Sequence, residues 1–94
     1  MNEQPKELLI DVSEYEPPQP FEEVIQLLLQ MKAGEYIRML HRKKPLPLLQ
    51  FLQDNGFDFK ITHDESLSCD LVLWEIIIWD KKDTLVSQYC SKKF

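Results

Sequence analysis

Residues 8–21 read LLIDVSEYEPPQPF and join an apolar segment to a proline-rich turn that leads into a helical pattern. Leu8 to Val12 is short and ends in a β-branched residue, which predicts a first strand. Pro20 suits the first position of a helix, because the N–H that proline lacks would be unpaired there in any case. Between Tyr15 and Phe21 there is no Ser, Thr, Cys or His. A site at this turn would therefore lack an obvious nucleophile.

The next residues predict a helix and then a second strand. Apolar side chains recur at helical spacing from Phe21 to Met31, with Lys32 in the last turn and Gly34 just beyond. Residues 36–41 alternate in polarity, as a strand does. A strand, helix, strand order with one helix between favours a parallel, right-handed connection. We therefore expect the first two strands to be parallel neighbours.

The second half of the chain predicts one more helix and two more strands. Pro47 can open a helix that ends at Gly56, since glycine tolerates the left-handed conformation found there. Residues 57–62 alternate between apolar and polar side chains, which is typical of an edge strand with one wet face. Residues 63–70 are polar and predict a loop, and residues 71–79 form the most hydrophobic strand.

The predicted fold is a single α/β domain of order βαβαββ. It is a two-layer sandwich with two helices on one face of a four-stranded mixed sheet. Residues 1–7 are expected to form a flexible N-terminus, residues 8–80 the α/β domain, and residues 81–94 a short helix or a loosely docked tail. A chain of 94 residues has room for one hydrophobic core.

The two faces of the last strand differ in character. One is wholly apolar and should face the helices; it holds Val72, Trp74, Ile76 and Ile78. The other is mostly apolar, and together with Leu9 it predicts an exposed patch whose candidate interface residues are Tyr36, Leu40, Leu73, Ile77 and Trp79. Such a patch would bind a protein partner or a second copy of the chain. Alternatively, the tail folds back and covers part of it with Leu85, Val86 and Tyr89.

Charge and hydropathy exclude several classes of partner. The formal net charge of −5 disfavours nucleic-acid binding, which needs a basic surface to release counterions. The N-terminus lacks the basic start and apolar run of a secretory signal, so we expect a cytoplasmic protein. The longest apolar run, residues 71–79, is interrupted by Glu75 and is much shorter than the roughly 20 residues that span a bilayer. No membrane association is expected.

A second candidate site lies where the first two strands end. If these strands are parallel, their carboxyl ends bring residues 13–20 beside residues 41–45, at the edge where open α/β sheets favour ligands. The candidate binding edge comprises Tyr15, Glu16, Pro17, Pro18, Pro20, His41, Arg42, Lys43 and Lys44. Its three adjacent cations would lie near the amino end of the first helix and could attract a small anion or an acidic peptide. Alternatively, these cations only balance the acids Glu14, Glu16, Glu22 and Glu23.

The sequence predicts no catalytic residue, cofactor or metal. His41 is a lone histidine without a partner at catalytic spacing, and His41, His63, Cys69 and Cys90 contain no pair at metal-site spacing. The two cysteines have neither paired spacing nor a secreted context, so both are expected to be free thiols. Cys90 lies near Lys92 and Lys93 in the tail, where an exposed thiol could exchange.

The first half of the chain resembles the TusA-like, or SirA-like, sulfur-carrier superfamily. The residues that carry the likeness are LLIDVSEYEPPQPF at 8–21, the helix that follows, Gly34-Glu35 and the second strand. That family has an aspartate in its first strand and a Cys-Pro-x-Pro turn before its helix. Pro18 and Pro20 match the two prolines, but Pro17 stands where the family has its cysteine. The resemblance thus implies the fold without the atom that carries sulfur.

The second half is similar to an uncharacterised bacterial branch of that superfamily, a domain of unknown function that also lacks the cysteine. The likeness rests on His41-Arg42, the Pro-Leu-Pro-Leu of residues 45–48, and Gly56-Phe57. Together the two stretches cover residues 8 to about 79. They favour a non-catalytic interaction module. The alternatives are a sulfur-relay or redox accessory protein that uses Cys69 or Cys90, and a small-anion-binding domain.

Overall fold

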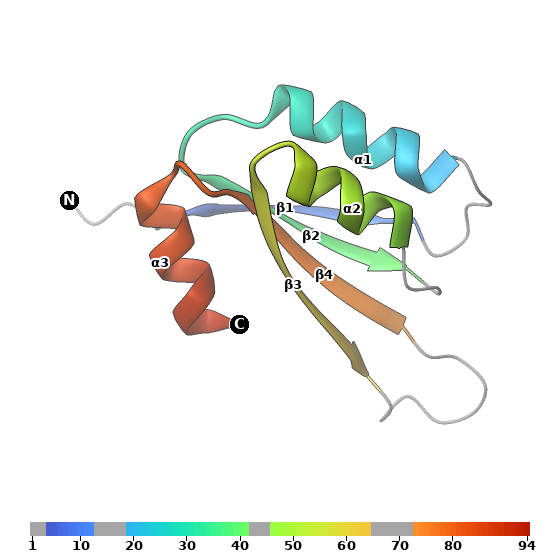
Figure 1. Cartoon of the computed structure of the whole chain (residues 1–94). Coiled ribbons are helices and arrows are strands. Elements are labelled where there is room, and N and C mark those ends of the chain that lie inside the picture. Colours follow the sequence, from blue (N-terminus) through green and yellow to red (C-terminus); the bar gives the residue numbers. More distant parts are fainter. Residues whose placement is uncertain (1–3, 13–18, 42–45, 65–72) are drawn as a thin grey trace.

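The computed structural model describes residues 4–12, 19–41, 46–64 and 73–94. Its elements are β1 (Lys6–Asp11), α1 (Gln19–Gln30), β2 (Glu35–His41), α2 (Leu46–Asp54), β3 (Phe57–Asp64), β4 (Leu73–Asp80) and α3 (Thr84–Lys93). Helices α1 and α2 lie on one side of the sheet, and α3 lies apart from them at one end of it (Figure 1). The predicted α/β fold, with two helices over a four-stranded mixed sheet, is confirmed.

The strands lie side by side in the order β1-β2-β4-β3. β1 is parallel to β2, as a connection through one helix requires, and the other two pairs are antiparallel. β3 is an edge strand, as the alternation of residues 57–62 predicts. β1 forms the other edge. Gly34 and Gly56 end the turns before β2 and β3 with φ angles of 84° and 80°, the left-handed region that glycine favours.

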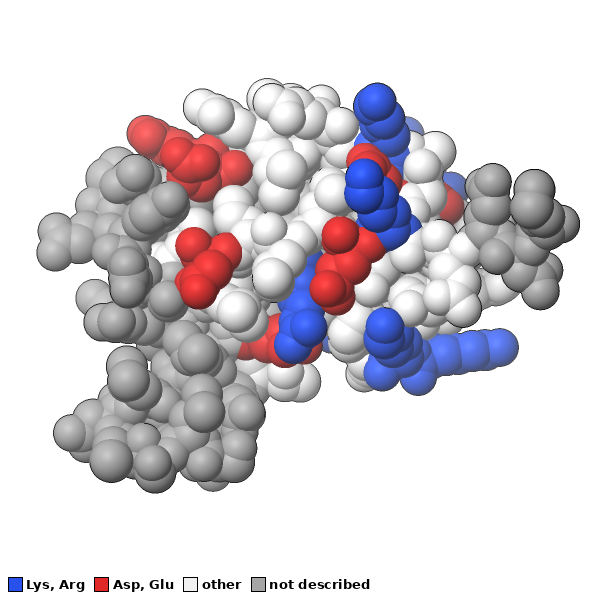
Figure 2. Space-filling model, turned by 180° about the vertical axis from the view of Figure 1, so that it is seen from behind, with Lys and Arg blue, Asp and Glu red and all other residues white. Residues whose placement is uncertain are grey.

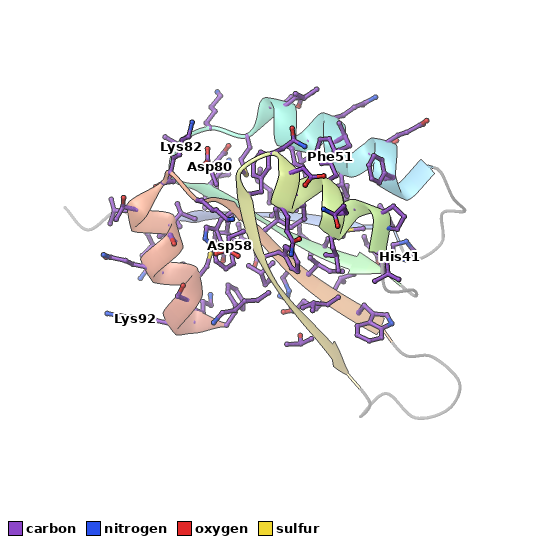
Figure 3. The ribbon with its side chains drawn as sticks, viewed as in Figure 1. His41, Phe51, Asp58, Asp80, Lys82 and Lys92 are labelled. Carbon is purple, nitrogen blue, oxygen red and sulfur yellow. The ribbon has the colours of Figure 1, made fainter. Side chains whose placement is uncertain are left out.

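The main core lies between the helices and the sheet. It is built from apolar side chains at alternate strand positions and on the inner helix faces, namely Val12, Val24, Leu28, Ile37, Met39, Leu48, Leu49, Leu52, Ile76 and Ile78. Ile76 and Ile78 face the helices, as predicted. Phe21 on α1 meets Phe51 on α2 edge to face, with ring centroids 5.7 Å apart (Figure 3). This contact closes the outer rim of the core.

Strand pairing extends two elements beyond their predicted limits. β1 begins at Lys6, inside the segment expected to be flexible, because the Lys6 N–H donates to the Gly34 carbonyl over 2.8 Å. β3 continues through residues 63 and 64, which were expected in a loop, because β4 offers them backbone partners. α1 ends earlier, at Gln30, so Lys32 lies beyond its last turn. For the two strands, hydrogen bonds to other strands or turns decide where the element begins or ends.

The last residues form a helix. Asp83 caps α3, its carboxylate accepting the Val86 N–H over 3.3 Å, and Lys92 and Lys93 lie in the last turn, where cations favour the helix dipole. Of the two expectations for residues 81–94, a short helix or a loose tail, the helix is correct.

Candidate functional site

The face of the sheet opposite α1 and α2 divides into a covered half and an open half. In the covered half α3 packs Val86 and Cys90 onto β2 and β4, forming a second small core. Tyr36, Ile77 and Trp79 in this core are at most 2% exposed. The prediction that these three residues lie in an exposed patch is therefore wrong. The alternative, in which the tail folds back, is correct for Val86 and Tyr89 but not for Leu85, which is 73% exposed.

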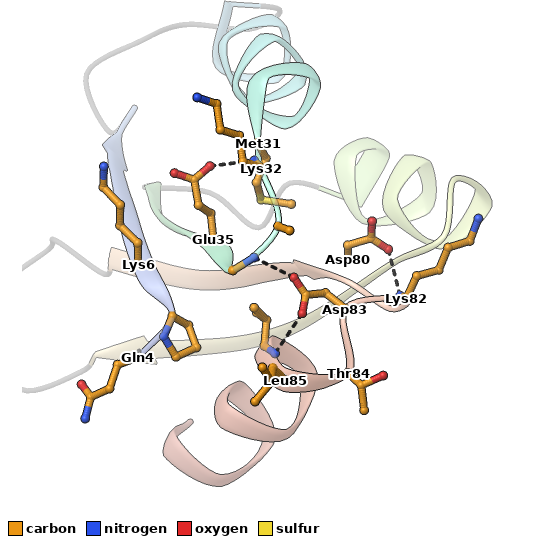
Figure 4. A pocket seen from close by; sticks show the side chains of 14 residues that line it. Gln4, Lys6, Met31, Lys32, Glu35, Asp80, Lys82, Asp83, Thr84 and Leu85 are labelled. Atoms are coloured by element: carbon orange, nitrogen blue, oxygen red, sulfur yellow. Dashed lines mark hydrogen bonds between the residues drawn. The ribbon is translucent and has the colours of Figure 1, made fainter. Parts of the chain in front are cut away.

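Polar contacts hold α3 at both ends. At its start, Asp83 Oδ2 accepts the Gly34 N–H over 2.8 Å, tying the helix cap to the turn before β2 (Figure 4). Near its end, Lys60 Nζ donates to the Ser91 carbonyl over 2.9 Å. Between these contacts the fit is less complete, since the buried indole N–H of Trp79 has no acceptor among the described residues. α3 is thus held by polar contacts at both ends and by the packing of Val86 and Cys90 between them.

Aromatic rings line the boundary of the covered half. Tyr36 meets Tyr89 and Phe94 at centroid distances of 5.7 Å each. Its hydroxyl donates to Glu7 Oε1 over 3.3 Å. Burial, and then the nearby Glu7 carboxylate, raise the pKa of Tyr36, so its phenol stays protonated to a higher pH than that of an exposed tyrosine.

The open half carries the residues that we name the open sheet patch: Leu9, Arg38, Leu40 and Glu75. Leu9 is 61% exposed, Leu40 is half-buried, and the register sets Leu9 beside Arg38 and Leu40 beside Glu75. An Arg38 guanidinium nitrogen donates to Glu75 Oε2 over 2.8 Å, and this hydrogen bond raises the pKa of Arg38. The patch therefore presents two leucines around an ion pair that is already formed. The side chain of Leu73, also predicted here, lies outside the described part.

A shallow hollow of about 940 Å³ lies at the opposite end of the strands from the predicted edge site (Figure 4). It opens between the start of β1, the turn before β2 and the turn before α3. Its acidic side chains accept backbone N–H groups: Glu35 from Lys32 over 2.6 Å, Asp80 from Lys82 over 2.9 Å, and Asp83 from Gly34. These carboxylates build the turns. We therefore assign the hollow a structural role and no ligand.

The predicted binding edge is described only in part. The Val12 N–H donates to the Leu40 carbonyl over 3.0 Å, so β1 and β2 do end at the same edge, as the parallel arrangement requires. His41, at the end of β2, is buried with 6% exposure (Figure 3). Pro20 falls in the first turn of α1. The other predicted residues, Tyr15, Glu16, Pro17, Pro18, Arg42, Lys43 and Lys44, lie outside the described residues.

Cys90 is a buried thiol, contrary to the expected exposed tail position. Burial raises its pKa to about 11, and the opposing effect of Lys60 and Lys93 is smaller. Nearby lysines were predicted to favour the thiolate by lowering the pKa of Cys90. Desolvation outweighs this effect, because α3 places the thiol in the second core. The position of Cys69 lies outside the described residues.

The described residues form neither a cluster of metal ligands nor a membrane-spanning helix. No three His, Cys, Asp or Glu side chains among them are grouped so as to hold a metal ion. None of the helices there is both long and apolar enough to cross a membrane.

Two structural features were missed at the level of sequence, although each left a signal. Asp83 precedes a helix by one residue and is a favoured N-cap type, which marks the start of α3. Arg38 and Glu75 are charged residues in the interior of the apolar stretches of residues 36–40 and 73–79. Opposite charges of this kind pair when the strands are neighbours, but only the register shows that they are.

Comparison with known proteins places the chain in a family. Residues 9–76 match the family described as an uncharacterized conserved protein (DUF2249). The chain belongs to this family. No curated protein and no solved structure matches it. The matched DUF2249 segment runs from β1 into β4 and stops before α3, so the helix that covers half of the second sheet face lies beyond it.

Proposed function

We propose that this DUF2249 protein is a non-catalytic interaction module that binds a protein partner through the open sheet patch. The observation that carries the proposal is the unequal cover of the second sheet face. α3 buries Tyr36, Ile77 and Trp79, whereas Leu9 on the same face is 61% exposed. Exposed apolar side chains grouped on a sheet are typical of binding surfaces.

The chemistry of the patch suits a binding role. Arg38 and Glu75 neutralise each other at 2.8 Å, so a partner would not have to bury a lone charge there. Leu9 and Leu40 on neighbouring strands would supply the apolar contact. A partner that bound here would also lie beside α3.

Site-specific photo-cross-linking tests this proposal. A photoreactive amino acid would replace Leu9 or, as a matched control, Leu46 on α2, since these leucines are 61% and 62% exposed. In living cells we expect position 9 to yield a discrete adduct that position 46 does not. An adduct of twice the mass of the chain would identify the partner as a second copy. Equal, diffuse labelling from both positions would contradict the proposal.

We further propose that the domain is a TusA-like scaffold that has lost carrier chemistry and works in the cytoplasm. Support comes from the match of Pro18 and Pro20 with the carrier turn, from Pro17 at the cysteine position, and from the parallel β1–α1–β2 unit. The buried Cys90, with its raised pKa, disfavours a substitute thiol there. After treatment of the reduced protein with a persulfide donor, we expect intact mass to show no stable added sulfur. A stable adduct at Cys69 or Cys90 would favour the sulfur-relay alternative.

A further inference from the structure

We propose that β1 binds an extended, basic segment of the partner protein as an added edge strand. This inference rests on the proposed interaction function and names how and with what chemistry the partner binds. Among the described strands, β1 has one neighbour, β2, and its other side is an edge of the sheet. An exposed edge offers backbone donors and acceptors to an incoming strand.

The hydrogen bonds to β2 show which backbone groups face outward. The N–H groups of Lys6 and Val12 donate to carbonyls of the β2 side, at 2.8 and 3.0 Å. Backbone groups alternate in direction along a strand, so those of Leu8 and Ile10 also point toward β2. The N–H and C=O groups of Glu7 and Leu9 therefore point away from the sheet.

The same residues set the side-chain chemistry of this edge. Glu7, Leu9 and Asp11 are all exposed and share the second sheet face, while Leu8 and Ile10 face the main core. Seen from behind, the surface carries acidic side chains, some surrounded by uncharged surface and others next to Lys or Arg side chains (Figure 2). One carboxylate oxygen of Glu7 accepts the Tyr36 hydroxyl over 3.3 Å. On this face β1 thus carries Glu7, Leu9 and Asp11 at alternate positions.

Cross-strand pairing then specifies the complement. Residues directly opposite each other on one sheet face interact, and opposite charges stabilise such pairs. A matching segment has Lys or Arg, then an apolar residue, then Lys or Arg at alternate positions. The chain's net charge of −5 also favours the approach of a basic segment.

A second copy of the chain is a poor occupant of this edge. In an antiparallel pair of two β1 strands, outward-facing residues must lie opposite one another. The register with the most contacts sets Leu9 against Leu9 and sets Glu7 of each copy against Asp11 of the other. Like charges directly opposite each other destabilise a pair. The edge therefore selects a basic strand over itself.

A labelled synthetic peptide tests the inference by fluorescence anisotropy. The probe has arginine, valine and arginine at alternate positions with threonine between, and its control replaces both arginines by glutamate. We expect the arginine peptide to bind and the glutamate peptide to bind at least about tenfold more weakly. In an antiparallel pairing that sets this valine opposite Leu9, the valine N–H faces β1, so N-methylation of the central valine should abolish binding. N-methylation of a neighbouring threonine, whose N–H faces away, should leave the affinity within about twofold.

Protein variants test the same geometry from the other side. Leu9→Pro removes an outward N–H but leaves the hydrogen bonds to β2 in place. Leu9→Ala keeps that N–H and serves as the control. Circular dichroism checks that both variants fold. We expect the affinity for the arginine peptide to fall about tenfold more in Leu9→Pro than in Leu9→Ala. The double variant Glu7→Lys and Asp11→Lys should reverse the preference and bind the glutamate peptide.

Two results would overturn the inference: equal tolerance of the two N-methylations, or no reversal of peptide preference in the lysine variant. If the cross-link from position 9 to a cellular partner persists in that event, the interaction function stands and the partner uses the sheet face instead of the edge. If the peptide results overturn the inference and the cross-link from position 9 is also lost, the proposed function is refuted as well.

Discussion

The two faces of the sheet are built from the same four strands but are packed very differently. The face toward α1 and α2 carries a continuous core that draws on all four strands. The other face carries a small core under α3, limited to Tyr36, Ile77, Trp79, Val86 and Cys90 with flanking rings. Beyond α3 that face is open at Leu9. One face thus carries the main core, and the other leaves part of its surface open.

The difference also appears in how polar groups are used. The second face keeps the Arg38–Glu75 ion pair and a buried Trp79 indole N–H without an acceptor among the described residues. A buried donor that lacks an acceptor costs free energy. We infer that the cover provided by α3 is the weaker of the two interfaces, which leads to three predictions.

The largest effect is expected from a matched pair of isoleucines on β4 that face opposite ways. Ile78 lies in the main core and Ile77 under α3, and both are buried. Ile78→Ala should lower the free energy of unfolding by about 3–4 kcal/mol, because the surrounding core cannot collapse into the cavity. Ile77→Ala should lower it by about 2–3 kcal/mol, because α3 can shift to fill part of the space. Urea unfolding measures both, and equal losses would refute the ranking of the two cores.

A smaller effect is expected from Asp83→Ala, which removes the α3 cap and the link to Gly34. Loss of a helix cap costs about 1–2 kcal/mol. Amide hydrogen exchange should become faster in α3 and stay unchanged in α1 and α2, since only the second face loses a contact.

The control for that variant is Asp80→Ala, because the Asp80 carboxylate accepts the turn N–H of Lys82 and no other hydrogen bond from the residues that the structure describes. Its effect on α3 exchange should be smaller. If both variants accelerate exchange equally, or if α1 opens together with α3, the second core is not a separate unit of stability.

The smallest effect concerns pH. Burial raises the pKa of Cys90 from 9.0 to about 11, so the unfolded thiol ionises before the folded one. The stability contributed by the neutral thiol is complete below pH 9.0 and is lost as the pH rises toward about 11. The raised pKa of Tyr36 acts in the same direction at higher pH.

Urea midpoints across this range should therefore fall more steeply for the wild type than for Cys90→Ala, which retains Tyr36. Native Cys90 should also react with a thiol reagent more slowly than the unfolded chain does. A wild-type curve parallel to that of Cys90→Ala would show that the thiol is not desolvated by α3.

Much of the fold could be read from local patterns. Several local signals correspond to elements of the structure. They are the alternation of residues 36–41 and 57–62, the helical spacing from Phe21, and the glycine at the end of α2, Gly56. These signals are local because alternation and capping act over a few residues. The limits of β1 and β3 were less well predicted, because partner strands extend them through backbone bonds that no side-chain pattern records.

The site was harder to predict than the fold. Residues 81–94 carry few apolar side chains, so the alternatives of a docked helix and a loose tail could not be separated by pattern. Docking of α3 buries Tyr36 and Trp79, which then leave the list of exposed candidates, and it also buries Cys90. Leu9 remains exposed, and it is not among the residues that pack in the second core.

The sequence alone determined the order of the first six elements, from β1 to β4, together with the parallel first pair and the apolar character of both sheet faces, because periodicity and turn chemistry are properties of neighbouring residues. Only the tertiary structure decided which half of the second face is covered, whether Cys90 meets solvent, and which backbone groups of β1 face outward. These depend on contacts between segments far apart in the chain, such as Asp83 with Gly34, and local patterns carry no information about such distances.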